Sequence, residues 1–296
     1  MAADHIAQVR RFNRLVTQRV GALDDHFLGR DRALGASRLL YEIGERGGAN
    51  LRELRQRLGL DAGYISRLVQ TLVKERLVRL SSDPADQRVR RAELTARGQR
   101  EVRELNARSD RQARELLDAV PPKQRERLVA AMAEVHRLLR AAGVVIARVD
   151  PASPAARWCW ARYFAELDQR FPQGFDPGAS LHVEGRDFGP PRGVFLVASI
   201  DDETVGGGCV KLSAPKVGWL KRMWVAESAR GLGIGRRLLE ALEREARALG
   251  ATMIRLDTNK ALKEAIALYR SAGYRQVRPF NEERYATHWF EKRLRG

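Results

Sequence analysis

The second half of the chain contains the glycine-rich sequence Arg230-Gly231-Leu232-Gly233-Ile234-Gly235-Arg236. Before it, residues 219–225 are rich in aromatic and β-branched side chains, which predicts a strand. After it, residues 238–246 carry leucine and alanine at helical spacing, which predicts an amphipathic helix. A glycine turn between the two exposes backbone N–H groups where the helix dipole favours an anion. The stretch therefore predicts a phosphate-binding turn; the alternative is a tight turn before an ordinary helix.

Two familiar phosphate-binding motifs do not fit this stretch. The glycines are spaced G-x-G-x-G, whereas a dinucleotide-binding fingerprint needs G-x-G-x-x-G. Gly235 is followed by two arginines, whereas a P-loop needs Lys and Ser or Thr. The stretch instead resembles the [Gln/Arg]-x-x-Gly-x-[Gly/Ala] motif of the GNAT N-acetyltransferases, which Arg230, Gly233 and Gly235 match.

The segment that follows strengthens this resemblance. Residues 252–256 alternate like a strand and lead to Asn259, and residues 261–270 read as a helix that ends in Ala-x-x-Leu-Tyr. Gly273-Tyr274 then closes the helix. GNAT enzymes show a similar order: a strand, an Asn, a helix with this ending and a Gly-aromatic pair.

The resemblance implies acetyl-CoA as the acetyl donor. Its pyrophosphate would lie on the amides of residues 231–236, and its pantetheine arm would pair with the strand near residues 223–225 and with Asn259. Tyr269 would protonate the departing thiolate as the catalytic general acid. Tyr269 also continues an apolar stripe of its helix, so plain core packing is the alternative. The implied cofactor-binding residues are Met223, Trp224, Val225, Arg230, Gly231, Leu232, Gly233, Ile234, Gly235, Arg236 and Asn259.

Length and composition set limits on the rest of the chain. The 296 residues predict two domains, and the net charge of +17 favours polyanionic partners. No apolar run approaches the length of a membrane span, and the first residues do not read as a secretion signal, so we expect a cytoplasmic protein without a membrane partner. The two cysteines predict no disulfide framework, and the five scattered histidines predict no metal site.

The first half contains a predicted helix-turn-helix. Asn50 caps a helix over residues 51–58 that ends at Gly59, and Asp61 caps a second helix whose buried stripe runs from Ile65 to Val73. A helical bundle with a polar surface is the alternative. The outward side chains of the second helix are types that reach bases and phosphates, and four of them are predicted to bind DNA: Tyr64, Ser66, Arg67 and Gln70.

A predicted hairpin favours DNA binding over the bundle. Residues 77–80 and 90–94 read as short strands around a polar tip, residues 81–88, which gives a winged helix. Asp86-x-Arg88 and the following Leu94-Thr95 resemble the wing of the MarR-type regulators. The resemblance implies that Arg88 enters the minor groove, oriented by Asp86, and we include Arg90 among the DNA-binding residues. A generic basic wing is the alternative.

The first and last helices of this half are candidates for a dimer interface. Apolar residues follow one face of residues 6–23, and residues 128–139 repeat them at heptad-like spacing. MarR-type proteins pair two subunits through these helices, which implies a homodimer on a palindromic double-stranded DNA operator. Packing against the protein's own core is the alternative.

Less is readable before the glycine turn and at the C-terminus. We expect a helix over residues 155–171, strands over 193–198 and 208–212, a turn with a bulge at residues 206–208, and a strand over 285–292. The residues that could bind or face the amine that accepts the acetyl group are the acids Glu166, Asp168 and Asp176 and the C-terminal residues Tyr285 and His288.

The expected fold class has two domains: residues 1–142 form a mainly α, MarR-like winged helix for DNA binding and dimerisation, and residues 143–296 form an α/β GNAT acyl-CoA N-acyltransferase fold. The expected function is a transcriptional regulator that also transfers acetyl from acetyl-CoA to a small-molecule amine by direct attack. The alternative is a transcription factor whose second domain only senses acetyl-CoA or an amine.

Overall fold

The chain folds into two units, each with its own buried core. The computed structural model describes residues 3–24, 26–45, 47–82, 90–180 and 185–294. The units are Met1–Leu128 and Val129–Gly296, and the division falls inside the helix α6 (Pro122–Ala142). Within the described ranges, no helix is long and apolar enough to cross a membrane.

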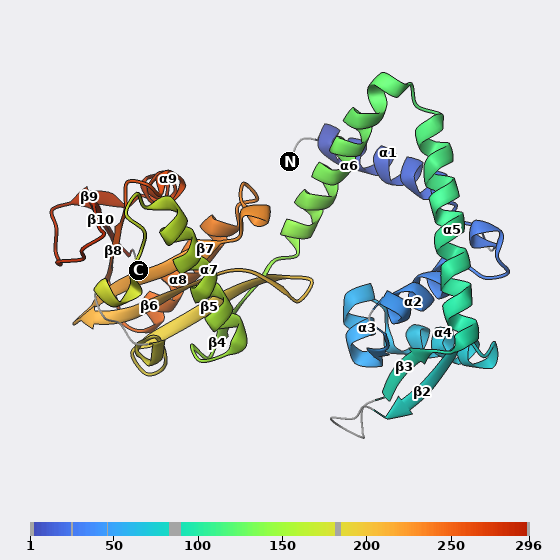
Figure 1. Cartoon of the computed structure of the whole chain (residues 1–296), viewed down its shortest axis with the longest axis horizontal. Helices are drawn as coiled ribbons and strands as arrows, with labels where there is room; N and C mark the ends of the chain where they lie inside the picture. The colour runs from blue at the N-terminus through green and yellow to red at the C-terminus, as the bar shows by residue number, and fades with distance from the viewer. Residues whose placement is uncertain (1–2, 25, 46, 83–89, 181–184, 295–296) are drawn as a thin grey trace. The chain divides into compact units, whose positions relative to one another are not determined.

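Polar caps fix the helix boundaries of the first unit. The Asn50 side chain accepts a hydrogen bond of 2.8 Å from the Arg52 amide, and Asp61 accepts one of 2.8 Å from the Tyr64 amide. Gly59 ends the first of these helices with a left-handed φ of 62°. These contacts confirm the predicted helix-turn-helix (Figure 1). The helices of the unit are α1 (Ala3–Arg19), α2 (Leu34–Glu45), α3 (Leu51–Leu58), α4 (Ala62–Lys74) and α5 (Ala96–Asp118).

A small antiparallel sheet completes the winged helix. Strands β2 (Val78–Ser82) and β3 (Arg90–Leu94) pair as predicted, and β1 (Ala49–Asn50), which was not predicted, pairs with β3. The unit's core is buried between α2, α3, α4 and the sheet. Val73 is 37% exposed, so the predicted buried stripe of α4 was wrong at this residue.

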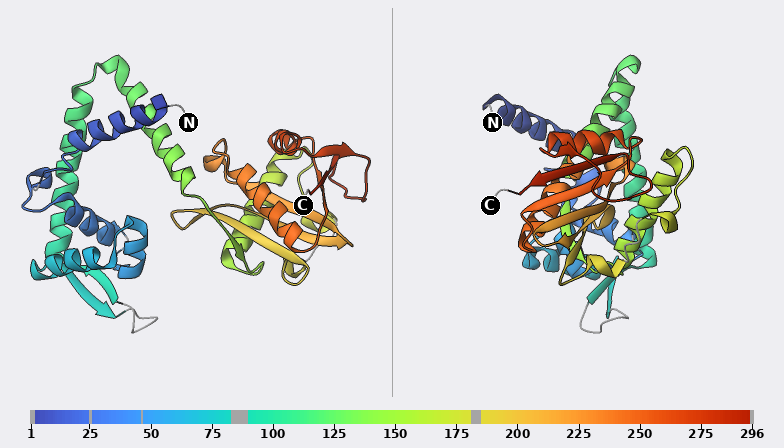
Figure 2. Two further views of the ribbon diagram at one scale, coloured as in Figure 1. Left: turned by 180° about the vertical axis from the view of Figure 1, so that it is seen from behind. Right: turned by 90° about the vertical axis from the view of Figure 1, so that its left-hand side faces the viewer.

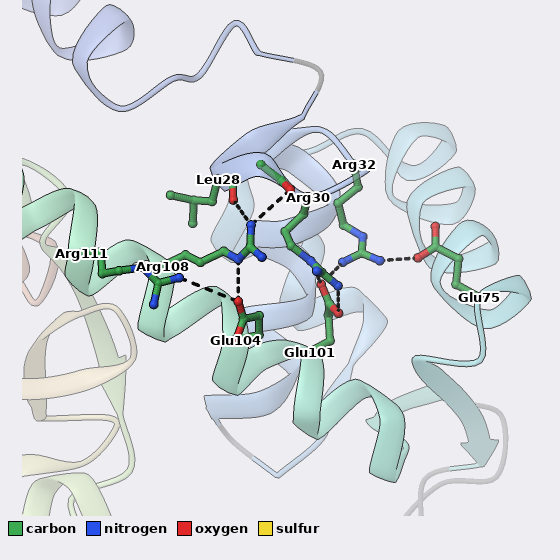
Figure 3. A network of polar contacts seen from close by, with 9 residues as sticks. Leu28, Arg30, Arg32, Glu75, Glu101, Glu104, Arg108 and Arg111 are labelled. Atoms are coloured by element: carbon green, nitrogen blue, oxygen red, sulfur yellow. Dashed lines mark hydrogen bonds and ion pairs between the residues drawn. The ribbon is translucent and has the colours of Figure 1, made fainter.

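An ionic network joins the segment before α2 to α4 and α5 (Figure 3). Arg30 donates two hydrogen bonds to Glu101, of 2.7 and 2.6 Å, and Arg32 bridges Glu101 and Glu75 at 2.6 Å each. Arg108 donates to the Leu28 carbonyl at 2.9 Å. Glu101 is 11% exposed, so this carboxylate is a buried anchor that holds the long helix α5 against the segment before α2.

The second unit is built on a seven-stranded mixed sheet with the order β4-β5-β6-β7-β8-β10-β9. All neighbouring strands are antiparallel except β7 and β8, which are parallel. The strands are β4 (Val145–Val149), β5 (Gly193–Ile200), β6 (Glu203–Ala214), β7 (Val217–Val225), β8 (Met253–Thr258), β9 (Arg275–Val277) and β10 (His288–Arg293).

Helices cover both faces of this sheet (Figure 2). Val194, Leu196 and other strand residues of the same parity pack against α8 (Ile234–Ala248) and α9 (Lys263–Ser271). Phe195, Val197 and Cys209 point to the opposite face and pack with α7 (Pro154–Arg170). Strand residues therefore alternate between two apolar layers, as expected for a central sheet.

The structure corrects two expectations for this unit. Residues 206–208 lie within β6, where the pairing with β7 shifts register after Gly207, so the predicted bulge is present but the predicted turn was wrong. The last strand begins at His288, which leaves Tyr285 in the preceding loop. Strand β9 was not predicted, because a three-residue strand carries too little pattern to read.

Candidate active site and DNA-binding surface

The glycine turn between β7 and α8 has the geometry that an anion needs. Gly231 and Gly233 have left-handed φ values of 74° and 76°, and Gly233 is the N-cap of α8. The first helical hydrogen bond runs from the Arg237 amide to the Gly233 carbonyl at 3.1 Å, so the amides before it have no acceptor inside the helix. A Cβ at Gly233 would meet nothing within 4 Å, so the space beside this glycine is open. The turn therefore fits a phosphate group.

The two arginines that flank the turn are held by side-chain and backbone partners. Arg230 donates to the Val225 carbonyl at 3.0 Å and to the Glu166 carboxylate. Arg236 donates to the Ser271 hydroxyl at 2.5 Å. In the structure described, these guanidinium groups tie the turn to β7, α7 and α9, and a role in binding cofactor phosphates stays a prediction for both.

The parallel strands β7 and β8 separate toward the turn. Their pairing runs from Val217 opposite Met253 to Trp219 opposite Arg255, while β7 continues to Val225 and β8 to Thr258. Among the described pairings, residues 220–225 are joined to β6 on one side only. This opening is where the predicted pantetheine-binding backbone of Met223, Trp224 and Val225 lies.

Two cavities meet beside this opening. The first, of about 400 Å³, is lined by the glycine turn, by residues 223–225 and by α7 and α9. The second is lined by α7, by residues 220–223, by the end of β8 and by the loop before β10. Both cavities are lined by Tyr163, Leu167, Met223, Leu262 and Ala265. A donor in the first cavity would therefore present its reactive end to the second.

Tyr269 lines the second cavity and lies on α9, the helix whose Ala265 lines both cavities. The side chain is 5% exposed and lies against the rings of Tyr274 and Phe290, at centroid distances of 5.7 and 6.0 Å. Burial raises the pKa of the Tyr269 phenol, and the nearby Asp257 carboxylate raises it further. The phenol is thus held in its protonated form, which is the form a general acid requires.

Asn259 also lines the second cavity, but its side chain is used by the protein. Its amide group donates to the Tyr285 carbonyl at 2.6 Å and its oxygen accepts from the Ala261 amide at 2.9 Å. These bonds hold the loop before β10 against the end of β8. A bond from Asn259 to the pantetheine arm stays a prediction.

The charged groups of the second cavity come from residues that sequence reasoning missed. Lys221 lies 2.9 Å from Asp257 and 3.5 Å from Glu283, and all three side chains are at most 12% exposed. Asn281 donates to Asp257 at 3.0 Å and Ser180 donates to Glu283 at 2.8 Å. Only the alternation of β7 hinted that Lys221 points inward. The residues come from three distant segments, so no spacing in the sequence connects them.

Aromatic rings form the opposite wall of the second cavity. Phe175 lies between Phe164 and Tyr285, at centroid distances of 5.6 and 4.8 Å, and Phe171 contacts both Phe175 and Tyr285. Beside them, Arg222 lies 4.4 Å from the Trp160 ring, and burial lowers the pKa of this arginine. The cavity thus combines an apolar wall with buried charges of both signs.

The sequence-predicted acceptor residues lie in different places. Glu166 lines the first cavity and binds the Trp224 indole at 2.7 Å, whereas Asp168 accepts from the Phe175 amide at 3.0 Å and Asp176 from the Gly178 amide at 2.8 Å. All three carboxylates are bonded to other groups of the protein. Tyr285 lines the second cavity.

His288 and the cysteines complete the candidate list of reactive groups. The His288 ring contacts the Thr287 hydroxyl at 2.9 Å and is not among the residues that line either cavity. Cys159 and Cys209 are free and buried, and burial raises the pKa of each thiol, that of Cys159 to about 12. Within the described part of the chain, no three His, Cys, Asp or Glu side chains group to hold a metal ion.

The predicted DNA-binding side chains of α4 share one exposed face. Tyr64, Ser66, Arg67 and Gln70 are all exposed, while Ile65 and Val69 between them are buried in the core. The Arg67 guanidinium lies 6.0 Å from the centre of the Tyr64 ring. Arg90, at the start of β3, is exposed as well. Asp86 and Arg88 fall outside the described residues.

Comparisons with known proteins match two parts of the chain to two different families. The model of the acetyltransferase (GNAT) family matches residues 132–274, and that of the MarR family matches residues 29–89. The chain is similar to an IAA acetyltransferase of Azospirillum brasilense, at 37% identity over 46% of this chain and 88% of that protein. It is also similar to an aminoglycoside N(6')-acetyltransferase type 1 of Stenotrophomonas maltophilia, at 30% identity over 44% of this chain and 86% of that protein.

A solved structure shows a further likeness. An acetyltransferase of the GNAT family from Staphylococcus aureus MU50 has a TM-score of 0.45 at 17% identity, covering 51% of this chain and 99% of that one. With the two family matches and the relatives above, the class of protein is a MarR-type regulator fused to an acetyltransferase. The chain belongs to the GNAT acetyltransferase family, whose members use acetyl-CoA, and it carries a MarR family region before the acetyltransferase.

Proposed function

We propose that the protein binds a palindromic DNA operator as a homodimer and transfers acetyl from acetyl-CoA to the amine of a small molecule. The single observation that supports the enzymatic part is that two cavities share lining residues, the first reaching the glycine turn and the second reaching Tyr269. We expect the protein to be cytoplasmic, because it must have access to the DNA operator that it would bind. Functionally we assign residues 1–142 to DNA binding and dimerisation and residues 143–296 to acetyl transfer.

The chain's own residues would divide the work of the reaction. When bound, acetyl-CoA supplies an activated acetyl group. The amides at the start of α8 and the strand backbone at residues 223–225 would hold the donor, and a strand amide near Met223 would stabilise negative charge on the carbonyl oxygen. The second cavity would orient the amine for direct attack, and Tyr269 would give its proton to the departing sulfur.

We take the acceptor to be a small molecule because the second cavity is lined by residues of α7, β7, α9 and the loop before β10. Its aromatic wall would contact an apolar or cationic body, and its buried charges would select the polar groups of the substrate. The relative from Stenotrophomonas maltophilia is named for an aminoglycoside, which supports an amine as the acceptor class.

The experiment that tests this proposal is the release of free thiol from acetyl-CoA by the full chain, measured against a panel of amines and amino acids. Release that depends on the acceptor supports the enzyme and begins to name its substrate. Tight binding of acetyl-CoA without turnover on any acceptor contradicts it and supports a sensor instead. Operator binding with and without acetyl-CoA would then be the next measurement.

The proposed dimer interface uses the apolar faces of α1 and α6. Each helix carries a row of large apolar side chains that are exposed in the single chain. A second copy that pairs through these helices would bury them, and two recognition helices would then read two half-sites. The exposed apolar residues are Ile6, Val9, Phe12, Leu15 and Val16 on α1 and Val129, Met132, Val135, Leu138 and Leu139 on α6.

A further inference from the structure

The C-terminal part of α6 is fastened to the acetyltransferase unit by three arginines. Arg140 donates to Asp201 at 2.9 Å, in the turn between β5 and β6. Arg237, in the first turn of α8, donates to the Ala141 and Val144 carbonyls at 3.1 and 2.9 Å. The third is Arg137, which donates to the Arg230 carbonyl at 3.2 Å and so reaches the beginning of the glycine turn.

The guanidinium of Arg137 is held in a fixed orientation. Its Nε and Nη2 atoms donate to the two carboxylate oxygens of Glu134, at 2.8 and 2.9 Å, in a bidentate pair one helical turn away. This pair leaves the Nη1 edge toward the turn, and Nη1 lies 3.8 Å from the position that a Cβ on Gly231 would occupy. Arg137 is 43% exposed, so a ligand on the turn can reach it.

The other two arginines of the turn have different tasks. Arg230 is bound by Glu166 and Arg236 by Ser271, on the side of α7 and α9. Arg137 approaches from the side of α6 and its planar fork is suited to phosphate oxygens. Helix amides and an oriented guanidinium together make a stronger anion site than either alone, because the charge adds to hydrogen bonds that are already directed.

We propose that Arg137 binds a phosphate of CoA, so that the cofactor site of the acetyltransferase is completed by the helix that precedes the domain. This inference rests on the proposed function, because it takes CoA as the ligand of the glycine turn. It places a cofactor contact on α6, which also carries an exposed apolar face. Binding of the cofactor would therefore act directly on the helix that we propose for dimerisation.

The test is the affinity of the full chain for CoA, measured by isothermal titration calorimetry with Arg137→Gln and Arg140→Gln. Arg140 is the matched control, since it lies on the same helix and binds Asp201 rather than the turn. We expect Arg137→Gln to bind CoA about tenfold more weakly, Arg137→Lys to recover part of this loss, and Arg140→Gln to bind like the wild type.

Two further ligands separate the phosphates and exclude an indirect effect. A loss that persists with dephospho-CoA assigns Arg137 to the pyrophosphate, and a loss that disappears assigns it to the 3′-phosphate. Pantetheine, which has no phosphate, is expected to bind wild type and Arg137→Gln alike. Equal CoA affinity of Arg137→Gln and Arg140→Gln, or an equal loss with pantetheine, would overturn the inference. A wild-type chain that binds no CoA would instead contradict the proposed function itself.

Discussion

Tyr269 is the residue on which the proposed chemistry depends most. It lies on α9 and continues the apolar stripe of that helix. The structure shows that it is both buried and part of a cavity wall. The two interpretations made from the sequence are therefore compatible: the ring packs in the core, while the residue also faces the proposed acceptor.

We predict that Tyr269→Phe lowers kcat about 100-fold with little change in the affinity for CoA, because the proton donor is removed and the ring is kept. Thiol release measures the first effect and calorimetry the second. Tyr274→Phe is the control, since Tyr274 belongs to the same aromatic cluster but does not line the cavity. Equal turnover of wild type and Tyr269→Phe would refute the role.

Residues of the second cavity show what a single sequence does not reveal. Lys221, Asp257 and Glu283 come from β7, β8 and the loop before β10, and they meet only after the sheet has formed. By contrast, the glycine turn is a local feature, so its residues could be read directly. The geometry of a turn depends on residues that are adjacent in the sequence, whereas a cavity depends on contacts between residues that are far apart in it.

At the scale of elements, helix α5 is held by its ion pairs as well as by its apolar contacts. Burial acts to raise the pKa of Glu101, but hydrogen bonds from Arg30 and Arg32 outweigh it and leave this pKa below the usual value. A carboxylate with a lowered pKa stabilises the folded state fully above its unfolded pKa of about 4.3. That stabilisation is lost as the pH falls through the lower folded value.

We predict that Glu101→Gln destabilises the first unit by about 2 kcal/mol at neutral pH, because two guanidinium groups lose a charged partner. Urea unfolding at pH 7 and at pH 3 measures the difference, which is expected to shrink at the lower pH. Glu104→Gln, which removes a more exposed partner of Arg108, is expected to destabilise the unit much less, because water screens an exposed ion pair. Equal effects of the two variants would show that the network is not an anchor.

Helix α4 is the element that we expect to read DNA. Arg67→Ala is predicted to weaken operator binding about tenfold and to reduce its salt dependence, because a cation near phosphates is lost. Fluorescence anisotropy at two salt concentrations measures both effects. Arg157→Ala, an exposed arginine on α7 of the other unit, is the control. Binding by Arg67→Ala that equals the control would remove this residue from the interface.

The boundaries of helices could be predicted where a capping residue or a glycine stands at the helix end. Asn50, Gly59 and Asp61 define α3 and α4 through local bonds, and each was read correctly. The short strands β1 and β9 were missed, because their existence depends on partners elsewhere in the chain. The glycines at residues 206–208 predict a turn with a bulge, because glycine usually marks a turn; the bulge is present, but the residues lie within β6, beside Cys159 and Met223.

For the molecule as a whole, the proposed dimer is open to a direct test. We predict that Leu139→Glu converts the dimer into a monomer, because it places a charge in an apolar interface. Light scattering of the full chain measures the mass. Val145→Glu is the control: Val145 is 62% exposed but lies on β4, outside α1 and α6. A Leu139→Glu protein that stays dimeric would place the interface elsewhere.

Helix α6 also affects where the coding sequence of the acetyltransferase could be cut from the rest of the gene. The division between the two units falls between Leu128 and Val129, inside a continuous helix. A break after Ala142 would remove Arg137 and Arg140 and take the Ala141 carbonyl away from Arg237. A gene fusion that joins this acetyltransferase to another regulator, whether in evolution or in the laboratory, would therefore keep these contacts only if it included the last turns of α6.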